Sequence, residues 1–230
     1  MRLLSLLVAL LAALAGCASK GSAVVDSIQV VFATGGTGVS KTAIAERPDP
    51  RFRYLRVEVE GFASGLMVLG YVDAHPQGPI EVWYSGTRET LRLQNGRVLG
   101  ATGSLHDWKA VTWAPAPPAW GHVTAQGSGF VRQRDAMPGY HFGIREQMQL
   151  VAWQGLPPIA LPDALPSAKA TTYQWYRESA AAGTGDAALP DAWFAWGKHL
   201  GEHMVVYSQQ CLAPDFCLKL QRWPLLEEAP

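Results

Sequence analysis

The sequence lacks two features that would limit its function at once: a long apolar run beyond its first residues, and an excess of charge. No later run approaches the roughly 18 to 20 apolar residues of a membrane-spanning helix. Its 19 basic residues balance 19 acidic ones, so no cationic surplus is available to neutralise the phosphates of a nucleic acid. These absences argue against a second membrane anchor and against nucleic acid as a partner.

Catalytic motifs are also scarce. The sequence contains no Gly-x-Ser-x-Gly nucleophile elbow, and no two acidic residues are recognisable as a glycosidase pair. Residues 35–42 resemble a phosphate-binding loop, but Ser40 replaces the second glycine, which permits close backbone approach to a phosphate. We therefore predict no catalytic residue and no cofactor.

One stretch fits a zinc-binding pattern. His199, Glu202 and His203 have the spacing H-x-x-E-H, which requires a helix to place both imidazoles on one face. Gly197 and Gly201 interrupt this stretch, and an alternating pattern resumes at residue 204. The pattern therefore predicts a turn between two strands, and we predict no metal site.

Cysteine is rare, with three in the chain. Cys17 ends the first apolar run, which leaves Cys211 and Cys217 as a possible pair. Five residues separate them, more than the two to four of a typical zinc pair, and no further ligands lie nearby. In an oxidising compartment this spacing favours a disulfide that closes a short loop.

The first residues have the features of a bacterial lipoprotein signal. Arg2 precedes eleven uncharged residues, 3–13, and the motif Leu14-Ala15-Gly16-Cys17 follows. The run is too short to span a bilayer comfortably, so it indicates a processed signal. Lipidation of Cys17 with acyl chains such as palmitate would give lasting membrane attachment. The alternative is an ordinary secretory signal with an accidental cysteine.

The residues after Cys17 indicate the destination. Ala18 and Ser19 follow it, whereas lipoproteins retained in the inner membrane tend to have aspartate there, so we expect the outer membrane and the periplasm. Residues 1–16 would be the signal peptide, and residues 17–23 the lipidated cysteine with a flexible tether. Removing 16 of 230 residues leaves 214. We expect residues 24–230 to form a single β-rich periplasmic domain.

The pattern of the domain is that of short strands. Its 16 prolines and 23 glycines suit many strands with tight turns, apart from one short helix predicted over residues 24–34. Asn95-Gly96 and residues 137–139 predict hairpins. We predict a mainly β fold, an antiparallel β-sandwich or open barrel of about ten short strands. The expected strands are residues 53–60, 66–72, 80–85, 90–93, 97–100, 129–134, 141–153, 171–178, 192–196, 204–208 and 218–223.

Nine tryptophans lie mostly in or beside these strands. Large aromatic side chains fill the cores of β proteins, which accounts for most of them. Others could form a platform on which sugar rings stack. The candidates for carbohydrate binding are Trp83, Trp175, Trp193 and Trp196.

Several stretches then occur in a characteristic order behind the Cys17 motif. They are Tyr54-Leu-Arg-Val57, Gly65-Leu-Met-Val-Leu-Gly70, Val82-Trp-Tyr-Ser85, Leu93-Gln-Asn-Gly-Arg-Val98, Thr102-Gly103, Trp193, Trp196, Val206-Tyr-Ser-Gln209 and Pro214. In this order they resemble the YjbF/GfcB-type lipoproteins of exopolysaccharide and group 4 capsule loci. The similarity is concentrated in residues 53–113 and 190–223, and the cysteine pair is not part of the family pattern.

The resemblance implies a periplasm-facing outer-membrane lipoprotein that assists export or assembly of a surface polysaccharide. Its partners would be the polysaccharide, a barrel protein of the outer membrane and soluble periplasmic proteins of the same system. The family supplies no catalytic residue. Two alternatives remain open, namely a hydrolase of envelope polysaccharide with dispersed carboxylates, and a structural envelope protein that binds only other proteins.

Overall fold

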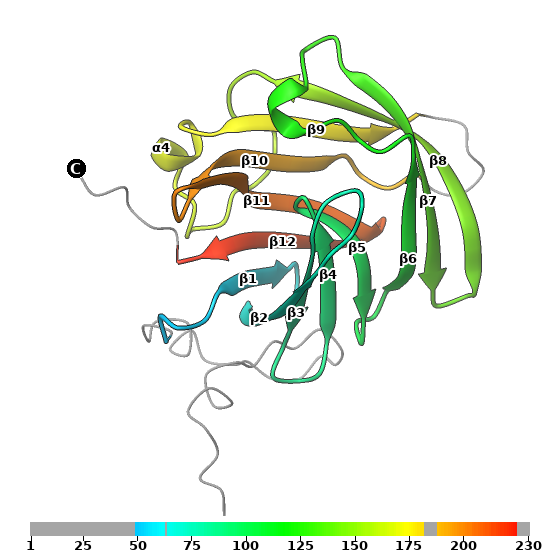
Figure 1. Cartoon of the computed structure of the whole chain (residues 1–230), viewed down its shortest axis with the longest axis horizontal. Helices are drawn as coiled ribbons and strands as arrows, with labels where there is room; N and C mark the ends of the chain where they lie inside the picture. The colour runs from blue at the N-terminus through cyan, green and yellow to red at the C-terminus, as the bar shows by residue number, and fades with distance from the viewer. Residues whose placement is uncertain (1–48, 63, 182–187, 225–230) are drawn as a thin grey trace, which may run out of the picture.

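Twelve strands form one closed antiparallel sheet in the computed structural model, which describes residues 49–62, 64–181 and 188–224. Each strand pairs with its neighbours in sequence, and β1 pairs with β12 to close the barrel (Figure 1). The strands are β1 Tyr54–Val59, β2 Gly65–Asp73, β3 Ile80–Tyr84, β4 Thr90–Gln94, β5 Arg97–Thr102, β6 Asp107–Ala114, β7 Ser128–Met137, β8 His141–Trp153, β9 Gln174–Ala180, β10 Ala192–His199, β11 Glu202–Ala213 and β12 Phe216–Trp223.

The prediction of a mainly antiparallel β fold is confirmed. The sheet has twelve strands, and the strand that the sequence pattern missed is β6. The sheet is closed, where the prediction was a sandwich or an open barrel, and six of its strand pairings contain a register shift of the kind that bends a sheet locally. The predicted helix, the Cys17 motif, the tether and the phosphate-loop-like stretch lie outside the described residues. The described part contains no helix of the length and apolar character needed to cross a bilayer.

The barrel is flattened into two walls whose strands cross. In Figure 1, β9 to β12 and β1 run across the view, whereas β6 to β8 run nearly at right angles to them. Polar side chains join the walls directly. The Trp108 Nε1–H donates to the carbonyl oxygen of Leu212 at 3.0 Å. The Gln210 amide donates to Gly96 and accepts from the Val98 N–H, both at 2.9 Å, so β11 is fixed against the β4–β5 hairpin.

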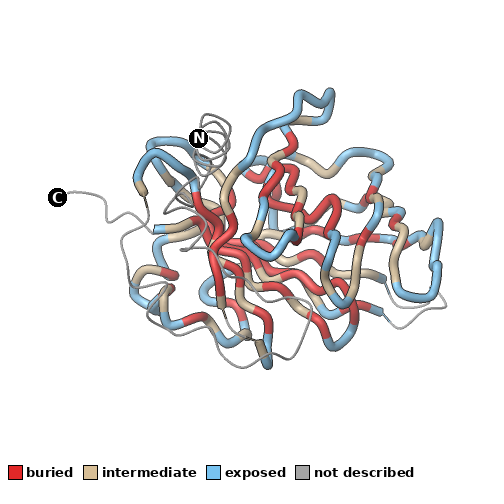
Figure 2. Tube along the Cα trace, turned by 90° about the horizontal axis from the view of Figure 1, so that it is seen from below, coloured by how far each residue is buried: buried red, intermediate tan, exposed pale blue. Residues whose placement is uncertain are grey.

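Apolar side chains fill the space between the walls. Leu55, Val57 and Val59 alternate along β1 and all point inward, as the period of two predicts. Figure 2 shows the buried stretches of backbone gathered along the middle of the molecule and the turns exposed around it. The spaces left by this packing include two small cavities of about 10 Å³ each, which is room for about one water molecule.

A second layer covers the outer face of one wall. The chain between β8 and β9 includes the short helix α4, Ser167–Ala170, and packs on β9, β10 and β11. Leu165 and Ala170 from this segment bury Trp175, Trp193 and Tyr207 from the strands beneath. The Trp175 Nε1–H donates to the carbonyl oxygen of Ala170 at 2.9 Å, which ties the layer down.

Neighbouring strands differ in how they are joined. Asn95-Gly96 and residues 138–140 connect hairpins as predicted, and both Asn95 and Gly96 have positive φ. Cys211 and Cys217 lie directly opposite each other on β11 and β12 and form the predicted disulfide. By contrast, a single residue pair, Ala101 with Trp108, bridges β5 and β6.

Candidate functional site

Three arginine–glutamate clusters lie among the inward-facing side chains, and in each an arginine guanidinium lies over a tryptophan ring. The clusters are Arg97–Glu178 with Trp120, Arg132 and Arg134 with Glu146 and Trp108, and Arg222–Glu81 with Trp83. Charged groups inside a protein are costly unless they are paired. Their repetition makes these clusters the main polar feature of the interior.

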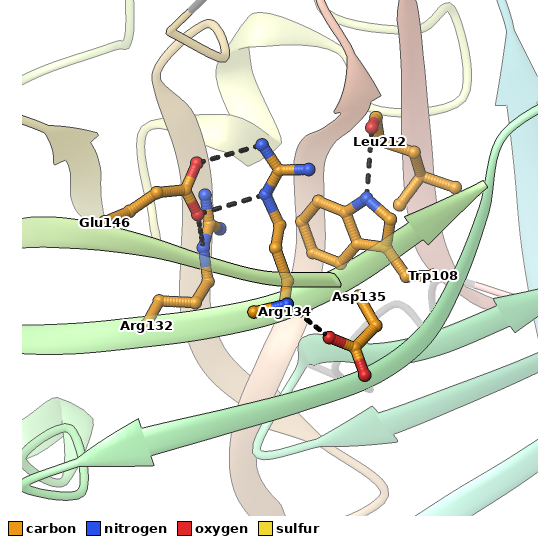
Figure 3. Close-up of polar contacts among 7 residues, drawn as sticks. Trp108, Arg132, Arg134, Asp135, Glu146 and Leu212 are labelled. Carbon is orange, nitrogen blue, oxygen red and sulfur yellow. Dashed lines mark hydrogen bonds and ion pairs between the residues drawn. The ribbon is translucent and has the colours of Figure 1, made fainter. Parts of the chain in front are cut away.

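The Glu146 cluster joins β7 to β8 (Figure 3). The Glu146 carboxylate accepts from Arg132 Nε at 2.7 Å and from Arg134 Nε and Nη2 at 3.1 and 3.2 Å. Figure 3 shows the Arg134 guanidinium between this carboxylate and the Trp108 ring. Burial alone would raise the pKa of Glu146, but the charges and hydrogen bonds of Arg132 and Arg134 together outweigh it and lower the pKa. Glu146 is therefore ionised at neutral pH.

The Arg97–Glu178 cluster joins distant parts of the chain. Arg97 Nε lies 2.5 Å from Glu178 Oε1, both side chains are buried, and the guanidinium carbon lies 3.8 Å from the Trp120 ring centre. Burial lowers the pKa of Arg97, against the opposing effect of Glu178. Arg97 Nη2 is buried without a hydrogen-bond partner. A small cavity of about 10 Å³ beside this pair is lined by Glu178 and Gln210, among other residues.

These clusters fit a structural role. Glu81, Glu146 and Glu178 each pair with a guanidinium, and Arg132 and Arg134 lower the pKa of Glu146. A carboxyl that donates a proton in catalysis needs the opposite environment, one that raises its pKa. In the described ranges, no three His, Cys, Asp or Glu side chains are grouped so that they could hold a metal ion.

The H-x-x-E-H stretch forms the predicted turn between strands. His199 pairs with Glu202 across the β10–β11 hairpin, and Lys198 pairs with His203. Leu200 and Gly201 form the turn with positive φ. The two imidazoles thus lie on a hairpin, not on one face of a helix.

The four predicted carbohydrate-binding tryptophans do not lie together. Trp83 is buried inside the barrel, and Trp175 and Trp193 are buried beneath the outer layer. Their rings pack against protein, and we do not carry them forward as a sugar-binding surface. Trp196 is half-buried within β10, and the His203 ring of β11 stacks on it with ring centres 4.8 Å apart.

Sequence reasoning missed a group of outward side chains on β2 to β6. Tyr71 and Tyr84 are 50% and 41% exposed, and their ring centres lie 6.4 Å apart. The adjacent Tyr84 hydroxyl raises the pKa of Tyr71. Arg92 lies on the same face of β4 and reaches the carbonyl oxygen of Lys109 at 3.3 Å. We call Tyr71, Tyr84 and Arg92 the outer platform. The strand alternation around Trp83 and Leu91 was the signal that could have located it.

A second exposed aromatic pair lies at the β7–β8 hairpin. Tyr140 and Phe142 are 74% and 61% exposed, with ring centres 6.3 Å apart. Tyr140 is in the turn itself, with φ of 59°. This pair projects from a hairpin end, whereas the outer platform lies along a sheet face.

Comparison with known proteins gives a family and a fold. Residues 25–165 match the profile of a family described as group 4 capsule polysaccharide lipoprotein gfcB, YjbF. No protein of curated function matches the chain. The crystal structure of the hypothetical lipoprotein YmcC from Escherichia coli K12 is similar, with a TM-score of 0.54 and 17% identity over 78% of this chain and 85% of that chain. At this identity the likeness is one of fold.

Proposed function

We propose a function from one premise, which is that this chain belongs to the YjbF family of group 4 capsule polysaccharide lipoproteins. Acyl chains on Cys17 hold the protein on the outer membrane, where its domain faces the periplasm. There it assists the export or assembly of a surface polysaccharide and catalyses no reaction itself. Its partners are the polysaccharide and the barrel and periplasmic proteins of the same export system.

The family match is the observation that carries this proposal. It covers residues 25–165, which begin at the second residue of the predicted domain. The motif Leu14-Ala15-Gly16-Cys17 supplies the attachment that a lipoprotein requires. Ala18 supports the outer membrane over the inner one.

The interior of the barrel supports a scaffold role. A glycosidase needs a carboxyl that carries a proton near neutral pH, whereas Arg132 and Arg134 lower the pKa of Glu146, and Glu81 and Glu178 each form an ion pair with an arginine. The space between the walls is packed with side chains, so the outer surface is what the barrel offers to a partner. Closed sheets are rigid supports for such surfaces.

A chromosomal deletion complemented by variants tests the proposal. The wild-type gene should restore cell-surface polysaccharide, whereas Cys17→Ser should take up no radiolabelled palmitate, leave the outer-membrane fraction and restore little polymer. Ala18→Asp should be labelled but remain in the inner membrane. Normal surface polysaccharide in the deletion strain, or unchanged labelling and fractionation of Cys17→Ser, would contradict the proposal.

A further inference from the structure

We propose that the outer platform binds a polysaccharide chain directly, with sugar rings stacked on Tyr71 and Tyr84 and hydrogen-bonded to Arg92. This inference rests on the proposed function, because the family associates the chain with capsule polysaccharide. The inference identifies the surface of the protein that would contact the polysaccharide.

Tyr71 and Arg92 lie in one row across the outer face of the sheet, and Tyr84 lies beside this row, opposite Val68 on β2 and Thr90 on β4. Tyr71 pairs with Val82, Val82 with Arg92, and Arg92 with Gly100, so the four positions follow one another across β2, β3, β4 and β5. Trp83 and the other inward residues of these strands belong to the core, so the alternate residues point outward. The buried Val82 separates Tyr71 from Arg92 in this row, and the Tyr84 ring, which lies against Gly70 beside Tyr71, gives an extended ligand its third contact.

Two glycines let the platform side chains lie flat. A Cβ at Gly70 would be 2.5 Å from the Tyr84 ring, and a Cβ at Gly100 would be 2.8 Å from the Arg92 guanidinium. The ring and the guanidinium therefore rest against the backbone of β2 and β5. Glycine inside a strand lacks a side chain to pack and marks a place of close approach. Here Gly70 and Gly100 allow the Tyr84 ring and the Arg92 guanidinium to lie against the sheet.

The chemistry of this surface fits a sugar polymer. Aromatic rings with a polar hydroxyl offer an apolar face together with a hydrogen-bonding edge, which matches the C–H faces and hydroxyl groups of a sugar. Arg92 supplies fixed donors for hydroxyl or carboxylate groups, and the Lys109 ammonium, 2.7 Å from Asp107, lies two strands away on β6. Two rings side by side fit consecutive units of one chain. Because the face is open, we expect weak binding to each unit and tighter binding to long chains.

Binding of the full-length lipidated protein in detergent micelles tests the platform. The probe is size-fractionated surface polysaccharide purified from the organism that encodes this chain, immobilised on a sensor. We expect saturable binding that weakens about tenfold in Tyr71→Ala and in Tyr84→Ala, since one lost aromatic stacking contact changes affinity by about that factor. Gly70→Ala keeps both tyrosines but displaces the Tyr84 ring, and should weaken binding severalfold.

The matched control is Tyr140→Ala with Phe142→Ala, which removes the other exposed aromatic pair and should leave binding unchanged. Circular dichroism and a urea unfolding curve for every variant separate lost binding from lost folding. Failure of the wild-type protein to bind the polysaccharide, or equal binding by Tyr71→Ala and Tyr84→Ala, would overturn the platform proposal. Loss of binding in the Tyr140/Phe142 control alone would do the same.

The deletion strain separates this inference from the proposed function. Suppose that platform variants restore surface polysaccharide as fully as wild type, and that the wild-type protein shows no affinity for it. The proposed binding at the outer platform is then wrong, while the proposed role in polysaccharide export is retained. If the deletion leaves surface polysaccharide unchanged, the proposed function itself falls.

Discussion

Replacing Glu146 with glutamine should destabilise the protein strongly, because it removes the one carboxylate that neutralises two largely buried arginines. Glu146 and Arg134 are buried, and Arg132 is only slightly exposed. Breaking a buried ion pair by removing one partner costs about 3–5 kcal/mol. Glutamine keeps the shape and one acceptor oxygen, so we expect a loss of about 3 kcal/mol in the free energy of unfolding.

Urea denaturation followed by tryptophan fluorescence measures this loss. With a slope of about 2 kcal/mol/M, a loss of about 3 kcal/mol lowers the urea midpoint by about 1.5 M. Glu202→Gln is the matched control, since Glu202 is exposed at the β10–β11 turn, and it should change stability by less than about 0.5 kcal/mol. Changing Arg132, Arg134 and Glu146 together to leucine or methionine should recover most of the loss, because no unpaired charge remains.

The pH dependence gives a second test of the same cluster. The folded pKa of Glu146 is lowered from its ordinary value of 4.5, so its ion pairs contribute full stability above that pH. That contribution is lost as the pH falls from about 4.5 through the folded pKa. Glu146→Gln should therefore show a flatter fall in stability over this acidic range than wild type. A midpoint within 0.3 M of wild type (roughly 0.6 kcal/mol), or an identical acid profile, would refute the reasoning.

Three further predictions concern the rest of the barrel. Changing Cys211 and Cys217 to alanine should lower the free energy of unfolding by about 2 kcal/mol, the low end for a short loop, and reducing agent should then have no further effect on the urea midpoint. Gly96→Ala should cost more than about 2 kcal/mol because its Cβ would lie 2.5 Å from Val205, whereas Gly61→Ala, at a similar φ in open space, should cost about 1 kcal/mol by the same denaturation assay. Trp120→Phe removes the donor to the Asn95 carbonyl oxygen and should lower the thermal midpoint by several degrees, equivalent to about 1–2 kcal/mol; an unchanged midpoint would show that this hydrogen bond contributes nothing.

Much of the fold could be predicted because its signals are local. Leu55, Val57 and Val59 alternate with charged residues, and Asn95-Gly96 has the composition of a tight hairpin turn. The spacing of Cys211 and Cys217 likewise indicated their disulfide, which the structure contains. Each of these patterns occupies a few consecutive residues and depends on no distant partner.

The interior clusters and the closure of the sheet could not be predicted in this way. Arg97 and Glu178 are 81 residues apart, and nothing near either residue indicates the other. The bulges that bend the strands are single-residue shifts in register, which the alternating pattern tolerates without a visible break. β6 was missed because Asp107 and Lys109 flank Trp108, so its pattern is weakly apolar.

Three of the four tryptophan candidates, Trp83, Trp175 and Trp193, are buried, which the sequence alone did not indicate. Residue type indicates that a ring is large and apolar, but it does not indicate which layer covers it. Trp175 and Trp193 point out of the barrel, where a sugar could have reached them if the segment before β9 did not lie over them. Tyr71 and Tyr84 were overlooked, although it is their rings that remain open to solvent.

The single bridge between β5 and β6 leaves the backbone amides at that joint with fewer ladder hydrogen bonds than those of other strand pairs. Backbone amides beside it should exchange with deuterium earlier than those of β10 and β11, which share a long ladder. Arg92 crosses this joint from β4 to the carbonyl oxygen of Lys109 on β6. Arg92 therefore belongs to the outer platform and also links β4 to β6. Its replacement should speed amide exchange at this joint.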